Sequence, residues 1–160
     1  MPELIVRPMH GSEFDEWNEA TTRVLAAAQV AVGNWSSEDA PEMARRSRRE
    51  LLPDGLATAG MLFLRGFRPD GIPVGAAWLG LTHPRGTPDC AFLYFIEVDE
   101  AHRGTGYGRA LLSAAEEAAL SQGVKSLELN VFGFNTPAIH LYESAGYRVV
   151  TQHMRKSLDA

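Results

Sequence analysis

The stretch that decides the fold is Phe95-Ile-Glu-Val-Asp-Glu-Ala-His-Arg-Gly-Thr-Gly-Tyr-Gly-Arg-Ala-Leu-Leu112. The stretch begins inside a nearly continuous apolar run that covers residues 91–98. This run predicts a central strand over 91–98. After a short loop, alternate glycines precede or open an amphipathic helix, predicted from Tyr107 to Gln122. The first N–H groups of such a helix have no internal partners, and glycine lets a ligand approach closely. The pattern therefore predicts an anion site suited to phosphate.

Other glycine-rich motifs fit this stretch less well. A P-loop is excluded because no Gly-Lys-Ser/Thr follows the glycines. A dinucleotide fingerprint needs a third glycine or alanine where Arg109 stands, so a nucleotide-binding oxidoreductase is a weak alternative. A structural tight turn does not need three alternate glycines.

The hydrophobic pattern outward from this stretch predicts an α/β domain. The order is β-α-α-β-β-β-α-β-α-β, with a further strand possible at the end, and it predicts a mixed central sheet with helices on both faces. Strands are predicted at 4–8, 60–67, 74–81, 91–98, 127–131 and within 147–156, and helices opening at Ser12 and Ser36 and covering 107–122 and 137–145. Neither a repeat nor a linker interrupts the chain, which predicts a single domain over 1–160.

The composition narrows the class of protein. The 160 residues carry a net charge of −5, which argues against a general nucleic-acid binder. No apolar run approaches the roughly 18 residues of a membrane span, and the first ten residues lack the apolar core of a signal peptide, so we expect a cytoplasmic protein. The lone Cys90 cannot form an internal disulfide, gives no evident metal-ligand cluster, and is interpreted as a small hydrophobe; we expect no metal.

One basic cluster stands out in the second predicted helix. Its members are Arg45, Arg46, Arg48 and Arg49. They could form an anion-binding patch or a solvated helix face, and the acidic balance of the chain favours the solvated face. The apolar stripe of that helix is expected at Met43, Ser47 and Leu51, on the opposite side.

Two motifs carry a family resemblance. Arg103, Gly106 and Gly108 match Arg/Gln-x-x-Gly-x-Gly/Ala. About 30 residues later, the segment from Asn135 to Tyr147 matches Asn-x-x-Ala-x-x-Leu-Tyr-Glu-x-x-Gly-Phe/Tyr. With these motifs and the element order, the chain resembles the GNAT superfamily of acetyl-CoA-dependent N-acetyltransferases. The resemblance implies acetyl-CoA as cosubstrate, direct attack by a primary amine of a small molecule, peptide or protein, and homodimers as a frequent assembly.

The resemblance also implies roles for individual residues. The loop that would cradle the coenzyme A pyrophosphate contains Arg103, Gly104, Thr105, Gly106, Gly108 and Arg109. The pantetheine arm would insert where the central parallel strands splay, pairing with backbone near Ile96 and Val98. Asn135 would contact coenzyme A as well as cap a helix. Tyr142 would return a proton to the departing thiolate, whereas without the resemblance it would be interpreted as a core tyrosine.

The general base is left open. Glu97 is an acid in an otherwise apolar strand; it could attract or deprotonate the amine, or pair with an arginine at the strand end. Some family members use a glutamate five residues before the position of Asn135, but this chain has Asn130 there. Tyr94, Trp35 and His83 could line an acceptor pocket. A hypothesis from another class is a catalytically silent coenzyme A-binding regulatory module, which would bind the cofactor without turning over any amine.

Overall fold

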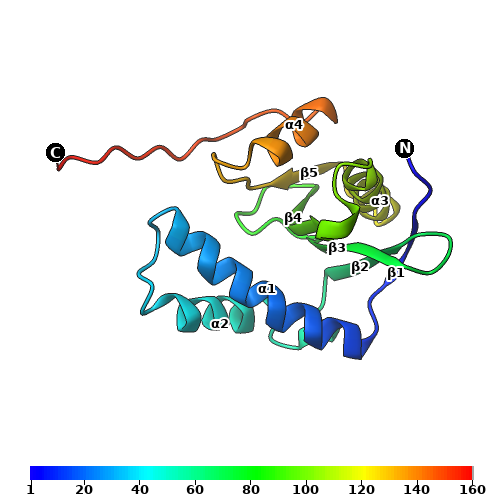
Figure 1. Cartoon of the computed structure of the whole chain (residues 1–160), viewed down its shortest axis with the longest axis horizontal. Helices are drawn as coiled ribbons and strands as arrows, with labels where there is room; N and C mark the ends of the chain where they lie inside the picture. Colours follow the sequence, from blue (N-terminus) through cyan, green and yellow to red (C-terminus); the bar gives the residue numbers. More distant parts are fainter. Residues whose placement is uncertain (160) are drawn as a thin grey trace. The chain divides into compact units, whose positions relative to one another are not determined.

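The structure is a computed structural model that describes residues 1–159. Contacts divide the chain into two compact units, Met1–Leu129 and Asn130–Ala160. The first unit holds one five-stranded sheet in the order β1-β2-β3-β4-β5 (Figure 1). Its strands are β1 (Ile5–Pro8), β2 (Met61–Phe67), β3 (Pro73–Gly80), β4 (Cys90–Val98) and β5 (Ser126–Leu129). The first four strands pair antiparallel, whereas β4 and β5 run parallel.

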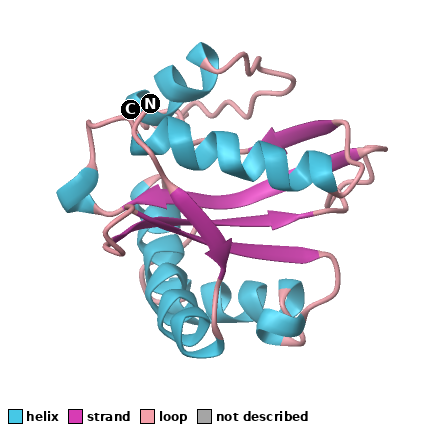
Figure 2. Ribbon diagram, turned by 90° about the vertical axis from the view of Figure 1, so that its right-hand side faces the viewer, coloured by secondary structure: helices cyan, strands magenta, loops and turns pink. Residues whose placement is uncertain are grey.

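Helices cover both faces of this sheet, as Figure 2 shows. They are α1 (Gly11–Ala31), α2 (Ala40–Leu51) and α3 (Tyr107–Ser121), with short 3-10 turns η1 (Gly55–Ala57) and η2 (Glu100–His102). The predicted α/β class, with a mixed sheet between helices, is therefore confirmed.

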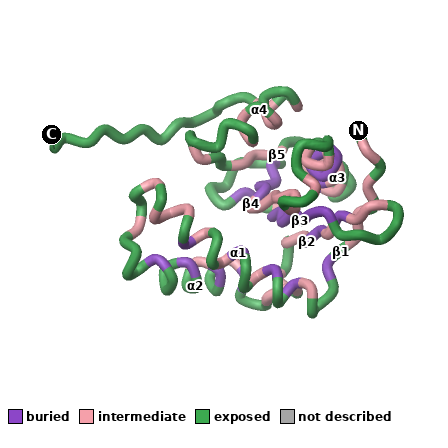
Figure 3. The backbone as a smooth tube through the Cα atoms, viewed as in Figure 1, coloured by how far each residue is buried: buried purple, intermediate pink, exposed green. Residues whose placement is uncertain are grey.

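The two faces have different cores. On the α1 face, aromatic rings from α1 and the sheet interlock: Phe14, Trp17, Phe63 and Trp78 are all buried. Figure 3 shows buried stretches of backbone in the helices and in the central strands. The Trp17 and Phe63 ring centroids lie 5.7 Å apart in an edge arrangement, the geometry that aromatic pairs prefer. On the α3 face, leucines pack on a sheet surface left flat by glycine. Leu111 contacts this surface from α3.

Two helix starts differ from the prediction for local reasons. α1 begins at Gly11 because the Glu13 carboxylate accepts a hydrogen bond from the His10 N–H (2.8 Å), which places the cap two residues before Ser12. α2 begins at Ala40, four residues after Ser36. The Ser36 hydroxyl accepts a hydrogen bond from the Asp39 N–H (3.1 Å), and this local turn occupies the expected first helical turn.

The arginine cluster on α2 is not wholly solvated, and the prediction is wrong for one member. The buried stripe of α2 consists of Ala40, Ala44 and Arg48, spaced four residues apart. Arg45 and Arg49 do lie on the exposed side, where both pair with Glu42. The two alanines let α2 approach α1 closely, and the Arg48 side chain fills the space beyond them.

The second unit contains α4 (Thr136–Ser144). Residues 147–156, predicted as one or two strands, contain no strand in the structure. A β-strand needs a partner for its ladder hydrogen bonds, and no strand in the described part of the chain pairs with this segment. Within residues 1–159, no helix is both long and apolar enough to cross a membrane.

Candidate active site

The distinguishing feature of the sheet is that β4 extends beyond the end of β5, its parallel neighbour. β5 pairs with β4 only from Cys90 to Leu93, where β5 ends at Leu129. Residues 94–98 of β4 therefore have no strand on that side among residues 1–159. An open edge of this kind presents backbone N–H and C=O groups that need partners. The splayed pair of parallel strands is thus present where the family resemblance implied it, although β5 stops two residues before the predicted end at 131.

A β-bulge on β4 sits where the strands part. The register on β3 shifts between Trp78, which pairs with Phe95, and Leu79, which pairs with Leu93. Tyr94 is the additional residue. Its ring stacks on Trp78 at 4.5 Å, while the ring of Phe95 lies 5.5 Å from that of Trp17. Two consecutive side chains therefore point to the α1 face, as a bulge allows.

The register also fixes which backbone groups face the open edge. Glu97 is opposite Ala76, and the Asp99 N–H donates to the Val74 carbonyl (2.8 Å). In an antiparallel pair, alternate residues direct their N–H and C=O groups to the same neighbour, so those of Ile96 and Val98 point away from β3. These are the two residues that the family resemblance assigned to pantetheine pairing.

Arg103 is folded back onto this edge. Its Nε donates to the Val98 carbonyl (2.9 Å), and its Nη2 pairs with the Glu97 carboxylate (3.0 Å). Pairing with an arginine was one of the two interpretations of Glu97, and the structure identifies that arginine as Arg103. Both side chains are substantially exposed, 57% for Arg103 and 41% for Glu97, so the pair is open to exchange.

The glycine-rich loop leads directly into α3, as predicted. Gly104 (φ 74°) and Gly106 (φ 91°) adopt left-handed backbone conformations, and Gly106 is the residue that caps the helix. Within residues 1–159, no side chain caps this end with a hydrogen bond, and the N-terminus of a helix favours an anion. The Thr105 hydroxyl donates to the His102 carbonyl (2.6 Å) and shapes the loop. Gly108 and Arg109 lie in the first turn of α3.

The remaining predicted residues lie in the second unit. The Asn135 side chain accepts a hydrogen bond from the Ala138 N–H (3.3 Å), which makes it the cap of α4. Tyr142 lies on α4 with its ring 5.8 Å from that of Tyr147, and burial raises the pKa of its phenol. A raised pKa keeps the hydroxyl proton in place near neutral pH.

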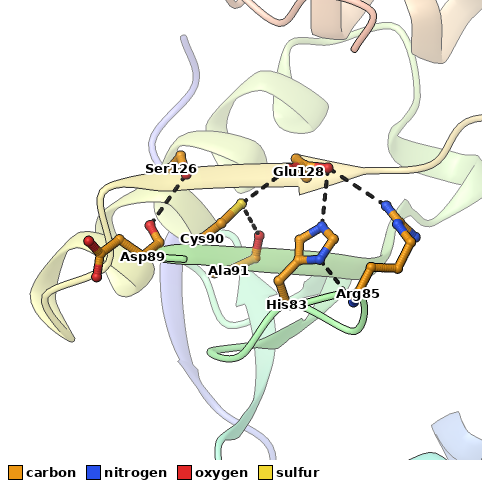
Figure 4. A network of polar contacts seen from close by, with 7 residues as sticks. All are labelled: His83, Arg85, Asp89, Cys90, Ala91, Ser126 and Glu128. Atoms are coloured by element: carbon orange, nitrogen blue, oxygen red, sulfur yellow. Dashed lines mark hydrogen bonds and ion pairs between the residues drawn. The ribbon is translucent and has the colours of Figure 1, made fainter. Parts of the chain in front are cut away.

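A polar cluster that sequence reasoning missed joins β4, β5 and the loop after β3 (Figure 4). His83 and Cys90 are buried, and each contacts a Glu128 carboxylate oxygen, at 3.1 Å from Nε2 and 3.5 Å from Sγ. The three ligand-type atoms lie within 4.8 Å of one another, so the expectation that Cys90 has no such neighbours is wrong. His83 and Glu128 are 45 positions apart in the sequence, so no short motif indicated that they meet.

The hydrogen bonding of His83 bears on what this cluster can hold. Its Nδ1 accepts from the Arg85 N–H (3.0 Å), which places the ring proton on Nε2, facing the Glu128 carboxylate. A metal on Nε2 would need that proton removed and the Arg85 donor turned away. The guanidinium of Arg85 also lies 3.7 Å from Glu128. The present arrangement therefore suits a hydrogen-bonded clasp between the strands better than a cation.

The mixed sheet, the open β4 edge and the glycine-rich start of α3 together define an α/β protein of the acetyltransferase type. A family model described as the acetyltransferase (GNAT) family matches residues 16–147. The chain belongs to the GNAT acetyltransferase family, which confirms the resemblance drawn from the two motifs.

Individual relatives agree with this assignment. The chain is 32% identical over 155 residues to YycN of Bacillus subtilis, named an uncharacterized N-acetyltransferase, covering 97% of this chain and 99% of YycN. YdgE of the same organism is 28% identical over 150 residues, covering 94% and 95%. The crystal structure of YycN superposes with a TM-score of 0.92 over 99% of this chain and 100% of that one. AAC(6')-Iy, in complex with a coenzyme A bisubstrate analogue, shares the fold alone, at 14% identity, 99% coverage of each chain and a TM-score of 0.65.

Proposed function

We propose that this chain transfers the acetyl group of acetyl-CoA to a primary amine by direct attack. The observation that carries the proposal is the open β4 edge beside the uncapped start of α3, both within one compact unit. The N-acetyltransferase names of YycN and YdgE support it. The family match crosses the boundary between the units, which supports a single domain over 1–160. The cytoplasmic location and the homodimer stay predictions.

The cofactor-binding roles follow from backbone direction and charge. The backbone groups of Ile96 and the Val98 carbonyl would pair with the pantetheine arm at the open edge. The pyrophosphate would lie at the α3 N-terminus, where the backbone N–H groups and the helix dipole favour anions. The residues proposed around it are Arg103, Gly104, Thr105, Gly106, Gly108 and Arg109, with Asn135 as a further contact from α4.

Arg103 and Glu97 suggest an order of binding. The Arg103 side chain occupies the Val98 carbonyl that the pantetheine arm would use. Acetyl-CoA would take over that carbonyl, and its pyrophosphate would compete for the guanidinium. The Glu97 carboxylate would then lose its cationic partner and become available to attract or deprotonate the amine. We therefore expect acetyl-CoA to bind before the acceptor.

In the chemical step, the amine nitrogen bonds to the thioester carbon and the carbon–sulfur bond breaks. The Val98 N–H, which faces the open edge, would stabilise the oxygen anion that forms during attack. The Tyr142 hydroxyl would deliver its proton to the departing thiolate, and the phenolate would regain a proton from water. The amine proton would leave through Glu97 or water.

The test is coenzyme A thiol release across amines of several classes, with acetyl-CoA binding measured on the same sample. A polyamine, an aminoglycoside, a lysine peptide and a peptide with a free N-terminus cover the acceptors we consider. Release with one class supports the transferase and assigns its acceptor. Binding without release from any amine would favour the silent regulatory module, and absence of binding would refute the cofactor site.

A further inference from the structure

The α1 face of the sheet contains a buried cation without an anion. Arg48 is only 7% exposed, yet no carboxylate lies within ion-pair distance of it among residues 1–159. Its Nη1 donates to the Asn18 side-chain oxygen and the Thr21 hydroxyl, both at 2.9 Å and both uncharged. Burial without a counter-charge lowers its pKa to about 10. Buried charged groups are rarely left without an opposite charge, because removing a charge from water is costly unless a partner compensates for it.

Aromatic rings form the walls around this cation. The Arg48 Cζ lies 4.9 Å from the ring centroid of Trp78 and 5.4 Å from that of Trp17. Such cation–π contacts lower the cost of burial but leave the hydrogen-bond donors of the guanidinium unused. The Nε and Nη2 atoms of Arg48 have no hydrogen-bond partner among residues 1–159. Trp17 Nε1 is the one side-chain polar atom of these residues that is both fully buried and without a partner, so the two Arg48 atoms are not fully buried. They therefore keep some contact with solvent.

A second donor without an acceptor belongs to one of the two rings that contact Arg48. The Trp17 Nε1–H is the one fully buried side-chain polar atom without a partner in the described residues. A buried donor without an acceptor costs about 1–3 kcal/mol. The Arg48 guanidinium and the Trp17 ring that it contacts therefore both carry donors without acceptors, and the charged one favours an anionic acceptor.

The cage adjoins the open part of β4. Trp17 packs on Phe95 and Trp78 stacks on Tyr94, and both partners belong to the segment that β5 leaves unpaired. Ala76, in the same core cluster, is opposite Glu97. The cage and the proposed amine-attracting carboxylate thus share one face of the sheet.

We propose that Arg48 is the anion-binding residue of the acceptor site, and that the acceptor is an amine that also carries a carboxylate. The planar guanidinium presents donors in a fork that matches a carboxylate. Its positive charge would bind the acid end of the acceptor, while Glu97 would attract the amine end. This inference rests on the proposed function for the transfer step, but binding of the acid end does not depend on turnover.

The test compares amines that differ only in the carboxylate. Unbranched ω-amino acids of two to six carbons are each paired with the n-alkylamine of equal length, and thiol release is measured for both. The variants are Arg48→Gln, Arg48→Lys and, as the matched control, Arg49→Gln, an exposed arginine on the same helix. Thermal unfolding of each variant checks that it is folded, and Arg48→Lys retains the charge if the glutamine variant does not fold.

We expect the wild-type protein to favour one of the amino acids at least 10-fold in kcat/KM over its alkylamine. Arg48→Gln should raise KM for that amino acid about 10- to 100-fold and leave the alkylamine unchanged. Arg48→Lys should restore part of the preference, and Arg49→Gln should match the wild type. Equal use of acids and alkylamines, or an equal loss for both in Arg48→Gln, would overturn the inference while leaving the transferase intact.

A separate readout covers the case in which no amine is acetylated. Binding of the same amino acids is then followed by tryptophan fluorescence, because Trp17 and Trp78 form the cage around Arg48. Saturable quenching that Arg48→Gln abolishes and Arg49→Gln retains would support the carboxylate site even though the proposed transfer had failed. No binding, or binding that is the same in both variants, would refute the site.

Discussion

Gly75→Ala should damage the cofactor edge through direct backbone contact. Gly75 lies on β3 opposite Val98. A Cβ at this position would stand 2.4 Å from the Glu97 carbonyl oxygen and 3.2 Å from the Val98 Cα. Carbon and oxygen atoms do not approach this closely, and the carbonyl is held in the sheet ladder. The β4 backbone must therefore move by roughly 1 Å to regain van der Waals distance.

The size of the effect follows from that displacement. Overpacking a well-filled core typically costs about 1–3 kcal/mol. For a domain of this size, that corresponds to a fall of roughly 3–10 °C in the midpoint of thermal unfolding. Because the residues that move include Glu97 and Val98, we also expect acetyl-CoA binding to weaken and kcat/KM to fall about 10- to 100-fold, as a 1 Å misplacement can do.

Gly66→Ala is the matched control. Gly66 pairs directly with Gly75 on the neighbouring strand, but its added Cβ would meet only side-chain methyl groups of Leu4 and Leu111, none nearer than 3.2 Å. These methyl groups can rotate away, so the free energy of unfolding should fall by less than about 1 kcal/mol. Calorimetric acetyl-CoA titration and thermal unfolding of both variants provide the measurement. Wild-type cofactor affinity in a folded Gly75→Ala would refute the assignment of this edge to acetyl-CoA.

Three further outcomes are expected. Tyr142→Phe should lower kcat about 100-fold at unchanged acetyl-CoA affinity, measured by thiol release and titration; full activity would remove it from the proton-donor role. Glu97→Gln should raise KM for the amine with little change in acetyl-CoA affinity; the reverse pattern would restrict Glu97 to anchoring Arg103. The Arg7 guanidinium lowers the pKa of Glu13 from 4.5 to about 2. Ionised Glu13 should therefore add about 1 kcal/mol to the free energy of unfolding above pH 4.5. That stability relative to Glu13→Gln should disappear as the pH falls towards 2, in thermal unfolding; a constant difference would contradict the pair.

Local signals account for what the sequence could predict. The strand, glycine loop and helix from residues 91 to 122 each carry their own pattern, and the structure places β4 and α3 there with ends shifted by one residue. The failures needed tertiary information. Residues 147–156 alternate like a strand, but no strand pairs with them in the described chain. His83 and Cys90 meet Glu128 only because β4 and β5 are neighbours.

Arg48 shows a different limit of sequence reasoning. Its helix has one stripe of Met43, Ser47 and Leu51 and another of Ala40, Ala44 and Arg48, and hydrophobicity favours the first. The structure buries the second because small residues let α2 approach α1, so close packing outweighed the charge. No pattern within α2 could reveal this, since the Trp17 and Trp78 rings that receive the guanidinium come from other elements.

The bulge at Tyr94 connects the two halves of the proposed site. Without the additional residue, Tyr94 and Phe95 would point to opposite faces, and one of them would leave the aromatic floor beneath the Arg48 cage. The same residue marks the point at which β4 loses its β5 partner and exposes the backbone of Ile96 and Val98. In the proposed site, one irregularity would therefore build the acceptor floor on one face and open the cofactor edge beside it. The amine and the thioester can then meet at the same short length of strand.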